Sequence, residues 1–413
     1  MRRFGGDDAG QMIVLFGLML TVLVFSVGIA FNLGTLFVAR RSLQEAADAA
    51  SFGGAVVLFN GGTGTAAESA AQTDFQSNSF TLPDPNIAFA AHSPPWAGEP
   101  HAGDAAYIYV TVSQSVRTPL LPAEGGLTSV TVRSTAGSVR TPSGYALLAL
   151  NATAPSSLYL FSTGATTVSN GDVQVDSNSA TAAVKTAGSF VLNTGVTARA
   201  VGGQTGFTNM QTGQASVADP LSGYLRPSLS GLTPHGNVTV LSSTTLDPGT
   251  YKNLIINCVF GCTVTFNPGL YVLLGGGLQA INTATLSGTG VTFFNTLQNY
   301  PTETGSCGAV TIAVNSNVTI SAPTSGYYSG MLFFQDPSCT QMLAITANGS
   351  ITSSNGSIYA PKATVEIAGT NTISIGGQII GDMVWVAGGA SVNINYDTAT
   401  VASPNLPALV STP

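Results

Sequence analysis

Four cysteines are the residues of this chain best suited to covalent chemistry. Cys258 and Cys262 lie in the string NCVFGC, and Cys307 and Cys339 flank two or three short β-rich runs. Four cysteines can pair in three ways. We predict a Cys258–Cys262 disulfide that closes a tight turn and a Cys307–Cys339 disulfide that joins adjacent coils of the β region. A zinc site is the alternative, but no C-x2-C pair occurs and only His235 is nearby.

Carboxylates are the next candidates, because cleavage of a polysaccharide needs two of them around one bond, or a base with cations and Ca²⁺. From residue 150 onward only Asp172 and Asp176 are close in sequence, and on a strand they would share a face. A Ca²⁺ site there is the alternative to solvated turn carboxylates. Motifs of nucleophilic, zinc and nucleotide-binding sites do not occur. We predict no catalytic, metal-binding or cofactor-binding residues.

A third polar group lies in the loop HSPPWAGEPHAGD. It contains His92, Trp96, Glu99, His101 and Asp104. Their spacing matches no known set of metal ligands. We therefore interpret this stretch as a solvent-exposed loop, with a ligand site as the alternative.

The elements that position these residues must be built with very few charges. The 413 residues include 12 Lys and Arg and 19 Asp and Glu, which is 8% of the chain, against about 25% in an average soluble protein. A net charge of −7 with few cations argues against general nucleic-acid binding. A hydrophobic content of 44% is too high for a disordered chain. Uncharged polar surfaces are common outside the cell.

An apolar segment near the N-terminus predicts a membrane anchor. Met12 to Phe31 reads MIVLFGLMLTVLVFSVGIAF, which spans about 30 Å as a helix. We predict a cytoplasmic tail over 1–11 and a retained transmembrane helix over 12–38. Arginines on both sides nearly cancel the positive-inside signal. Because disulfides persist outside the cytosol, we place the cysteine-bearing part outside the cell membrane.

A helical extension is predicted over 39–59. Ala46, Ala50 and Gly54 follow one another at intervals of four residues, which allows a close approach of another element. The sequence leaves two alternatives for the element on which this stripe of small residues packs. The stripe packs either on the protein's own downstream domain or on a helix of another subunit.

An ordered string runs from the end of the apolar segment into the helical extension. It reads Leu36-Phe37-Val38-Ala39-Arg40-Arg41, then Leu43-Gln44, then Ala46-Ala47-Asp48-Ala49-Ala50. Together with a short polar start that ends in Gly10-Gln11 and an uncharged span, this string resembles the TadE/TadG-like proteins of tight-adherence (Flp-type) pilus systems. Processed prepilins carry a Glu five residues after the cleavage glycine, and no Glu follows Gly10 at that distance. The resemblance therefore implies the uncleaved, TadG-like branch.

Beyond the anchor, we predict a small α+β module over 60–142, with a helix followed by two alternating strands. The resemblance implies the same module. From 143 to 401, runs of four to six β-forming residues recur with short Gly, Asn or Ser separators, which favours a parallel β-helix (β-solenoid). The residues 204–235 are predicted to be an inserted or crossover loop, and 402–413 a Pro-rich tail.

Two features support a repeat in this β region. The strings Asp247-Pro248-Gly249-Thr250-Tyr251 and Asn267-Pro268-Gly269-Leu270-Tyr271 share the P-G-x-Y pattern at a spacing of one plausible coil. Several runs also end in asparagine, which tolerates sharp turns and predicts a partial side-chain ladder. These asparagines are Asn193, Asn257, Asn267, Asn295 and Asn315.

The sequence thus predicts a mainly β, single-pass membrane protein, with its N-terminus cytoplasmic and its body at the cell surface. Its predicted role is non-enzymatic, in assembly or adhesion of a Tad/Flp-type pilus. The expected partners are the membrane and pilin-like or pilus-assembly subunits, with surface glycans as a further partner and no nucleic acid. The alternatives are a carbohydrate-binding adhesin and a polysaccharide lyase or hydrolase.

Overall fold

The computed structural model describes residues 8–59, 62–118, 127–140, 142–353, 355–403 and 405–410. The chain divides into two compact units. The first consists of residues 1–140 and 405–413, and the second of residues 141–404. The second unit is therefore inserted, in sequence, between two segments of the first.

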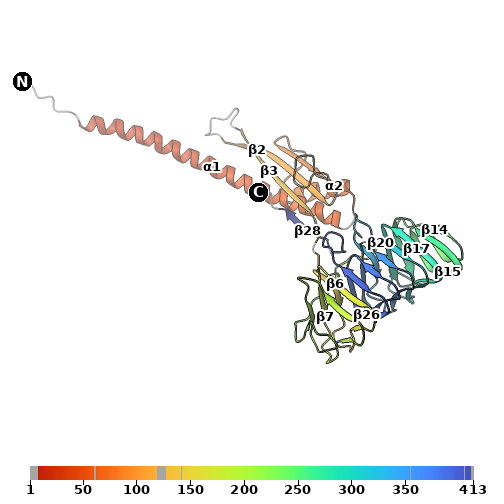
Figure 1. Ribbon diagram of the computed structural model, residues 1–413. Coiled ribbons are helices and arrows are strands. Elements are labelled where there is room, and N and C mark those ends of the chain that lie inside the picture. Colours follow the sequence, from red (N-terminus) through yellow and green to blue (C-terminus); the bar gives the residue numbers. More distant parts are fainter. Residues whose placement is uncertain are drawn as a thin grey trace, which may run out of the picture. The chain divides into compact units, whose positions relative to one another are not determined.

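Within its described residues, the first unit combines helices with an antiparallel sheet (Figure 1). Thr63 caps the shorter helix, since its hydroxyl accepts a hydrogen bond from the Ala66 amide. The last strand lies in the stretch 402–413 that was expected to be a tail. The elements are α1 (Asp8–Phe59), α2 (Gly64–Ser77) and the sheet β1 (Ile87–His92), β2 (Tyr107–Arg117), β3 (Leu127–Arg140) and β28 (Asn405–Val410), in that order.

The second unit is one large sheet, with 24 strands among the residues that the structure describes. Its strands pair in parallel. A parallel sheet normally has both faces covered, unless it curves around a core of its own. Three series of pairings run through it. The long strands turn from one series into the next, so the sheet closes around its core like the wall of a barrel.

The three series share several strands. Series 1 is β13 (Pro234–Val240), β15 (Gly249–Phe266), β16 (Gly269–Leu274), β18 (Val291–Thr296), β21 (Met331–Gln335), β24 (Ser357–Gly369), β26 (Ile379–Gly388), β4 (Tyr145–Ala149), β7 (Asp172–Val175), β10 (Ala198–Ala200) and β12 (Met210–Gln211). Series 2 is β13, β15, β17 (Leu278–Thr289), β19 (Val310–Val314), β22 (Leu343–Ala347), β24, β26, β5 (Leu158–Leu160), β8 (Ala183–Lys185) and β11 (Gln204–Thr205). Series 3 is β14 (Thr244–Leu246), β15, β17, β20 (Val318–Ser321), β23 (Ile351–Ser353), β25 (Ile373–Ile375), β27 (Val392–Asn395), β6 (Ala165–Ser169) and β9 (Ser189–Leu192).

The order of the strands in space differs from their order in sequence. Series 1 and 2 begin with β13, and series 3 begins with β14. The strands that come last in the sequence of the unit, β26 and β27, pair with those that come first, β4, β5 and β6. The strands β9, β11 and β12 end the series. Residues 212–233, which contain no strand, connect that end with β13 at the opposite end. We call residues 212–233 the crossover segment.

The core of the second unit follows the alternation of the strands. In β19, for example, Val310, Ile312 and Val314 are buried, whereas Ala313 is exposed. Aromatic rings stack at one corner, where Tyr251 lies 5.9 Å from Tyr271 between ring centres. The prediction of a mainly β protein with a long N-terminal apolar helix is confirmed, as is the predominance of parallel strands.

Candidate functional site

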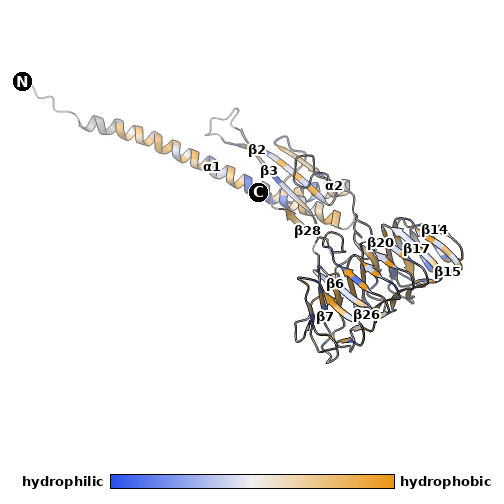
Figure 2. Ribbon diagram, in the orientation of Figure 1, coloured by the Kyte–Doolittle hydropathy of each residue, from blue (hydrophilic) through white to orange (hydrophobic). Residues whose placement is uncertain are grey.

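The N-terminal part of α1 is an exposed apolar surface. From Leu15 to Phe31 most side chains are exposed and apolar, as the orange colour along this helix shows (Figure 2). The hydroxyls of Thr21 and Ser26 donate hydrogen bonds to the carbonyls of Leu18 and Val22. Among the described residues, α1 is the one helix that is long enough and apolar enough to cross a membrane. An exposed apolar helix whose polar groups bond internally is suited to lipid.

The C-terminal part of α1 is buried against its own unit. Ala46 and Ala50 are buried in a core shared with α2, β2 and β3. A Cβ atom at Gly54 would lie 2.6 Å from Cδ1 of Ile108 and 3.0 Å from the carbonyl oxygen of Ala67. The small-residue stripe thus lies against the chain's own module, the first of the two alternatives left open by the sequence.

A polar boundary separates these two parts of α1. Arg41 forms an exposed ion pair with Glu45, 3.0 Å away on the next turn. Gln44 donates hydrogen bonds to Asp48 and to the carbonyl of Arg133 in β3. At this boundary the helix lies beside β3. Charged groups at the edge of an apolar span are typical of the membrane–water interface.

The histidine-containing loop is organised by stacking. His101 stacks on Tyr107 at 3.8 Å and His92 lies 4.8 Å from Trp96, between ring centres. His92 Nδ1 is also 2.6 Å from the carbonyl oxygen of Pro94. The histidine rings therefore have partners within the loop and at the first residue of β2. In the part of the chain that the structure describes, no three His, Cys, Asp or Glu side chains form a group that could hold a metal ion.

The two neighbouring carboxylates bind different groups. Asp172 forms a 2.7 Å ion pair with Arg199 and accepts a hydrogen bond from the Thr197 amide. Burial would raise the pKa of Asp172, but these partners together lower it below its usual value. Asp176 is buried and accepts hydrogen bonds from the Gln174 amide group and the Val217 backbone. Burial outweighs both bonds and raises the pKa of Asp176.

Both predicted cysteine pairs are disulfide-bonded in the structure. Cys258–Cys262 closes a short turn in which three residues, 259–261, have no pairing partner in the β15–β17 register. Cys307–Cys339 links two loops that follow β18 and β21. Among the described residues no cysteine is free. The first turn places Phe260 at its tip, fully exposed at 101%.

The crossover segment covers an outer apolar row of series 1. Leu221 and Tyr224 are buried in a cluster of their own, separate from the central core. The Tyr359 hydroxyl donates a 2.7 Å hydrogen bond to the carboxylate of Asp219. The Tyr300 hydroxyl donates one to the carbonyl of Pro227. The row beneath the segment contains Leu148, Val272, Phe294, Met331, Phe334 and Ile380.

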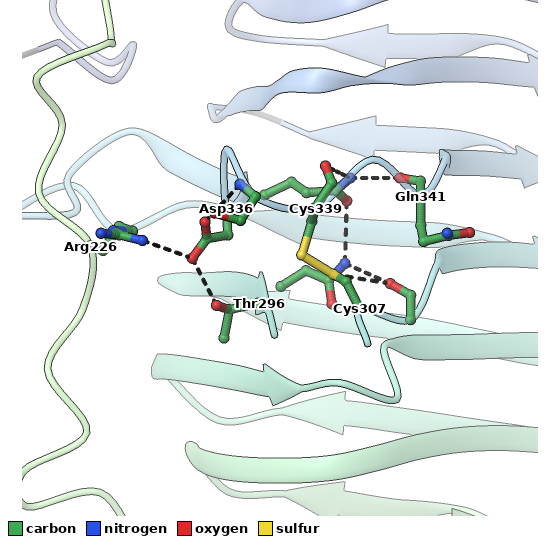
Figure 3. Close-up of a disulfide and its surroundings, with 10 residues drawn as sticks. Arg226, Thr296, Cys307, Asp336, Cys339 and Gln341 are labelled. Carbon is green, nitrogen blue, oxygen red and sulfur yellow. Dashed lines mark hydrogen bonds and ion pairs between the residues drawn. A yellow bond between two sulfur atoms is a disulfide. The ribbon is translucent and has the colours of Figure 1, made fainter. Parts of the chain in front are cut away.

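Arg226 connects the crossover segment to the Cys307–Cys339 region (Figure 3). Its guanidinium lies 2.5 Å from Glu303 and 3.5 Å from Asp336. Asp336 is fully buried and also accepts hydrogen bonds from the Thr296 hydroxyl and the Ser338 amide. The arginine and these two bonds satisfy the buried carboxylate. This cluster is structural in its contacts, since each polar atom described here has a partner within the chain.

Three aromatic side chains lie on the outer side of series 2. Trp385 and Tyr159 are partners in neighbouring strands, whereas the residues on either side of each are buried. Tyr159 stacks on Phe161 at 4.6 Å and meets Trp385 edge-to-face at 6.4 Å. An outward aromatic cluster on a sheet with few charges is a candidate ligand surface.

The comparisons with known proteins bear on α1. A family model with the description "Putative Flp pilus-assembly TadE/G-like" matches residues 10–57. These residues form a TadE/G-like segment. The predicted resemblance is thus confirmed for the anchor. Neither a curated protein nor a solved structure matches the chain.

The TadE/G-like segment contains both the exposed and the buried part of α1 and none of the parallel sheet. Sequence reasoning missed the contacts of the crossover segment, although the prolines of the predicted loop 204–235 marked it as a connection. The predicted loop is too long, because β11, β12 and the first residues of β13 lie within it. Hydrogen bonds between asparagines occur at some of the predicted turns, as a partial ladder requires. Asn257 accepts a bond from Asn282 and Asn315 from Asn348, whereas Asn267 donates to Asp247.

Proposed function

We propose that this chain is a non-enzymatic, membrane-anchored component of a Tad/Flp-type pilus assembly or adhesion system. The observation that carries the proposal is the TadE/G-like match over residues 10–57, which coincides with the exposed apolar part of α1 and its buried continuation. In this proposal residues 12–38 cross the membrane once. The N-terminus is cytoplasmic and residues 39–413 lie outside.

The proposed partners are the membrane and pilin-like or pilus-assembly subunits. Because Ala46, Ala50 and Gly54 are covered by the chain's own module, other subunits would contact the exposed apolar part of α1 instead. Within a membrane, such helix pairs are stabilised by close packing. Gly17 and Gly34 support this assignment, because a Cβ atom at either position would meet nothing within 4 Å.

We also infer that the second unit is a parallel β-helix. Three series of parallel pairings that share the strands β15 and β17 support a coil with three sides. The partners Tyr251 and Tyr271 of the two P-G-x-Y strings lie in successive coils in this interpretation. The body would then be a rod with an uncharged polar surface, suited to a structural or adhesive role.

A non-enzymatic role fits the contacts of the carboxylates. Asp172 is paired with Arg199, and Asp336 with Arg226, so these acids are bound by cations of the same chain. A general acid or base must instead reach its substrate. A polysaccharide lyase or hydrolase is the weaker alternative on these contacts.

The proposal is tested in the organism that makes the protein. Deletion of the gene should abolish Tad/Flp-type pili, and the full-length gene should restore them. A matched chain whose residues 12–38 are replaced by an unrelated transmembrane helix should reach the membrane but not restore pili. Normal pili in the deletion strain would refute the pilus role. A protease added outside cells whose cell membrane is intact should cleave residues 39–413. Full protection of these residues, although the protease can reach the outer side of that membrane, would refute the orientation.

A second candidate function is glycan binding by the body. The outward cluster of Trp385, Tyr159 and Phe161 favours it, since aromatic rings stack on the apolar faces of sugars. Trp385→Ala should then abolish binding of the full chain on a glycan array. Tyr145→Ala, which changes an aromatic residue elsewhere on the body, should leave that binding unchanged. Equal binding by both variants would refute this site.

A further inference from the structure

The two ends of the pairing series differ in how they are protected. At one end the last strands are very short, and Phe207 and Met210 are buried in the core beside Phe190. Phe190 and Phe207 pack edge-to-face at 5.2 Å. Short strands and an apolar cap are devices that prevent edge-to-edge association. This end is closed.

The opposite end offers a longer edge, because β13 has seven residues, although β14 has only three. Among the described residues, β13 and β14 pair only with β15, so one edge of each strand has no partner in the chain. The stretch 234–246 reads PHGNVTVLSSTTL and contains no Lys, Arg, Asp or Glu. An uncharged edge of β-forming residues pairs readily with another strand.

An apolar corner lies beside this edge. Leu241, in the turn between β13 and β14, is 69% exposed. Val259 and Phe260, in the adjacent disulfide-closed turn, are 61% and 101% exposed. The two turns are neighbours, since the Thr263 amide donates a 3.0 Å hydrogen bond to the Ser243 hydroxyl. The Cys258–Cys262 bond fixes the tip, which reduces the entropy that binding would cost.

We propose that this end of the second unit pairs with the same end of a second copy of this chain. Three observations favour a second copy. The edge lacks charges, so identical edges meet without repulsion. The strands at the other end, β9, β11 and β12, have only two to four residues, so they offer a head-to-tail chain of copies a much shorter edge for pairing. The body carries more acidic than basic residues, and the two turns of the corner, 241–243 and 259–261, contain no Lys or Arg, which disfavours an anionic lipid surface.

A two-fold axis through the corner gives the unpaired edges of both β13 and β14 a partner strand. It reverses the strand direction, so β13 of each copy lies antiparallel to β14 of the other. A register centred on Ser242 places Thr239 opposite Thr245 of the second copy, and Val238 opposite Leu246. Both threonines are exposed, whereas Leu246 is buried and Val238 is partly buried. The inward and outward faces therefore match, and the Leu241 and Phe260 side chains of the two copies meet beside the axis.

Charge pairs test this register in the full chain in detergent micelles. In Thr239→Lys/Thr245→Lys, lysines face lysines across the axis, and the dimer should be weakened at least about tenfold. In Thr239→Lys/Thr245→Glu, lysine faces glutamate, and the dimer should persist. Both variants change the same two exposed positions. Thr319→Lys, on the outer row of series 3 in the middle of the body, should not affect the dimer.

Analytical sedimentation measures the fraction of dimer in each variant. Phe260→Ser is a further variant, and because Phe260 is fully exposed, this change should not destabilise the folded monomer. It should weaken the dimer as well. A wild-type chain that stays monomeric would overturn the proposal. So would a dimer of equal strength in the two charge-pair variants, because that dimer would form elsewhere, for example through α1. Binding of the monomer to phosphatidylcholine vesicles that Phe260→Ser abolishes would assign the corner to lipid and also overturn it. None of these results depends on the pilus role.

Discussion

Asp172 and Asp176 show how the same side chain acquires opposite properties four residues apart. Asp172 gains a cation and an amide, whereas Asp176 is buried with neutral donors only. From the sequence both are equivalent acids on one strand. The difference depends on Arg199 and Val217, which reach them through the parallel pairing and the crossover segment.

This difference predicts opposite effects on stability. The folded-state pKa of Asp172 is lowered, so its stabilisation is present above the unfolded pKa and is lost as the pH falls through the folded value. Asp172→Asn should therefore destabilise the protein at neutral pH, by about 1 kcal/mol or less because the pair is partly exposed. Urea unfolding at neutral pH and at about pH 3 measures both effects.

Asp176→Asn is the matched variant. In the wild-type protein the folded-state pKa of Asp176 is raised, so the charged form is disfavoured at neutral pH and protonation of Asp176 stabilises the fold as the pH falls. Asparagine keeps the oxygen that accepts both hydrogen bonds. We expect no loss of stability at neutral pH and a weaker gain on acidification. A large loss at neutral pH would contradict this account.

The cluster around Arg226 predicts another contrast between two acids. Asp336 is completely buried, whereas the side chain of Glu303 is 48% exposed. Asp336→Asn should lower the free energy of unfolding by about 1–3 kcal/mol, because a buried network loses an acceptor. Glu303→Gln should lower it by less than about 1 kcal/mol. Equal losses in urea unfolding would show that burial does not determine the contribution of these acids.

At the scale of single elements, α1 combines two different environments in one helix. The apolar pattern of residues 12–31 was readable from the sequence because lipid requires a long uncharged run. The direction of the Ala46, Ala50 and Gly54 stripe was not, because small residues permit close packing on any element. The fold assigns it to α2, β2 and β3, all of which lie later in the chain.

Ala50→Leu tests the buried part of α1. Ala50 is fully buried, so the larger side chain should overpack the module and cost about 1–3 kcal/mol. Ala49→Leu, at the neighbouring and only partly buried position, is the control and should cost less. Thermal unfolding in detergent measures both. If Ala50→Leu leaves the unfolding temperature unchanged, the stripe does not pack as described.

The two disulfides close loops of very different length. Cys258–Cys262 has a sequence separation of 4 and Cys307–Cys339 of 32. Loop-closure entropy predicts contributions of about 2 and about 4 kcal/mol, respectively. Replacing both cysteines of a pair by serine should therefore destabilise the protein more for Cys307 and Cys339. The reverse order in urea unfolding would indicate that packing outweighs chain entropy here.

For the whole molecule, the sequence revealed the composition of the second unit but not its order. Short β runs and the spaced P-G-x-Y strings predict many short strands. Nothing local predicts that β27 pairs with β6, since Asn170 and Asn395 at this junction are 225 residues apart. Pairings over such distances are determined by the complete core and leave no periodic signal. The crossover segment is a consequence of this order.

Engineered cysteines test the junction. Thr167 and Asn393 are register partners in β6 and β27. The variant Thr167→Cys/Asn393→Cys should form an additional disulfide on mild oxidation, visible as a crosslinked pair of peptides after proteolysis. Thr167→Cys/Thr352→Cys is the control, because Thr352 lies in β23, two strands away from β27 in series 3. Crosslinking of the control alone would refute the observed order.

The insertion of the second unit into the first has a mechanical consequence. The chain leaves the small sheet at the end of β3 and returns at the start of β28, and these two ends are register partners, Arg140 and Asn405. A tensile force on the second unit therefore acts on two neighbouring strands at the same end of one sheet. The load is divided between these two strands, so neither of them carries the whole force alone.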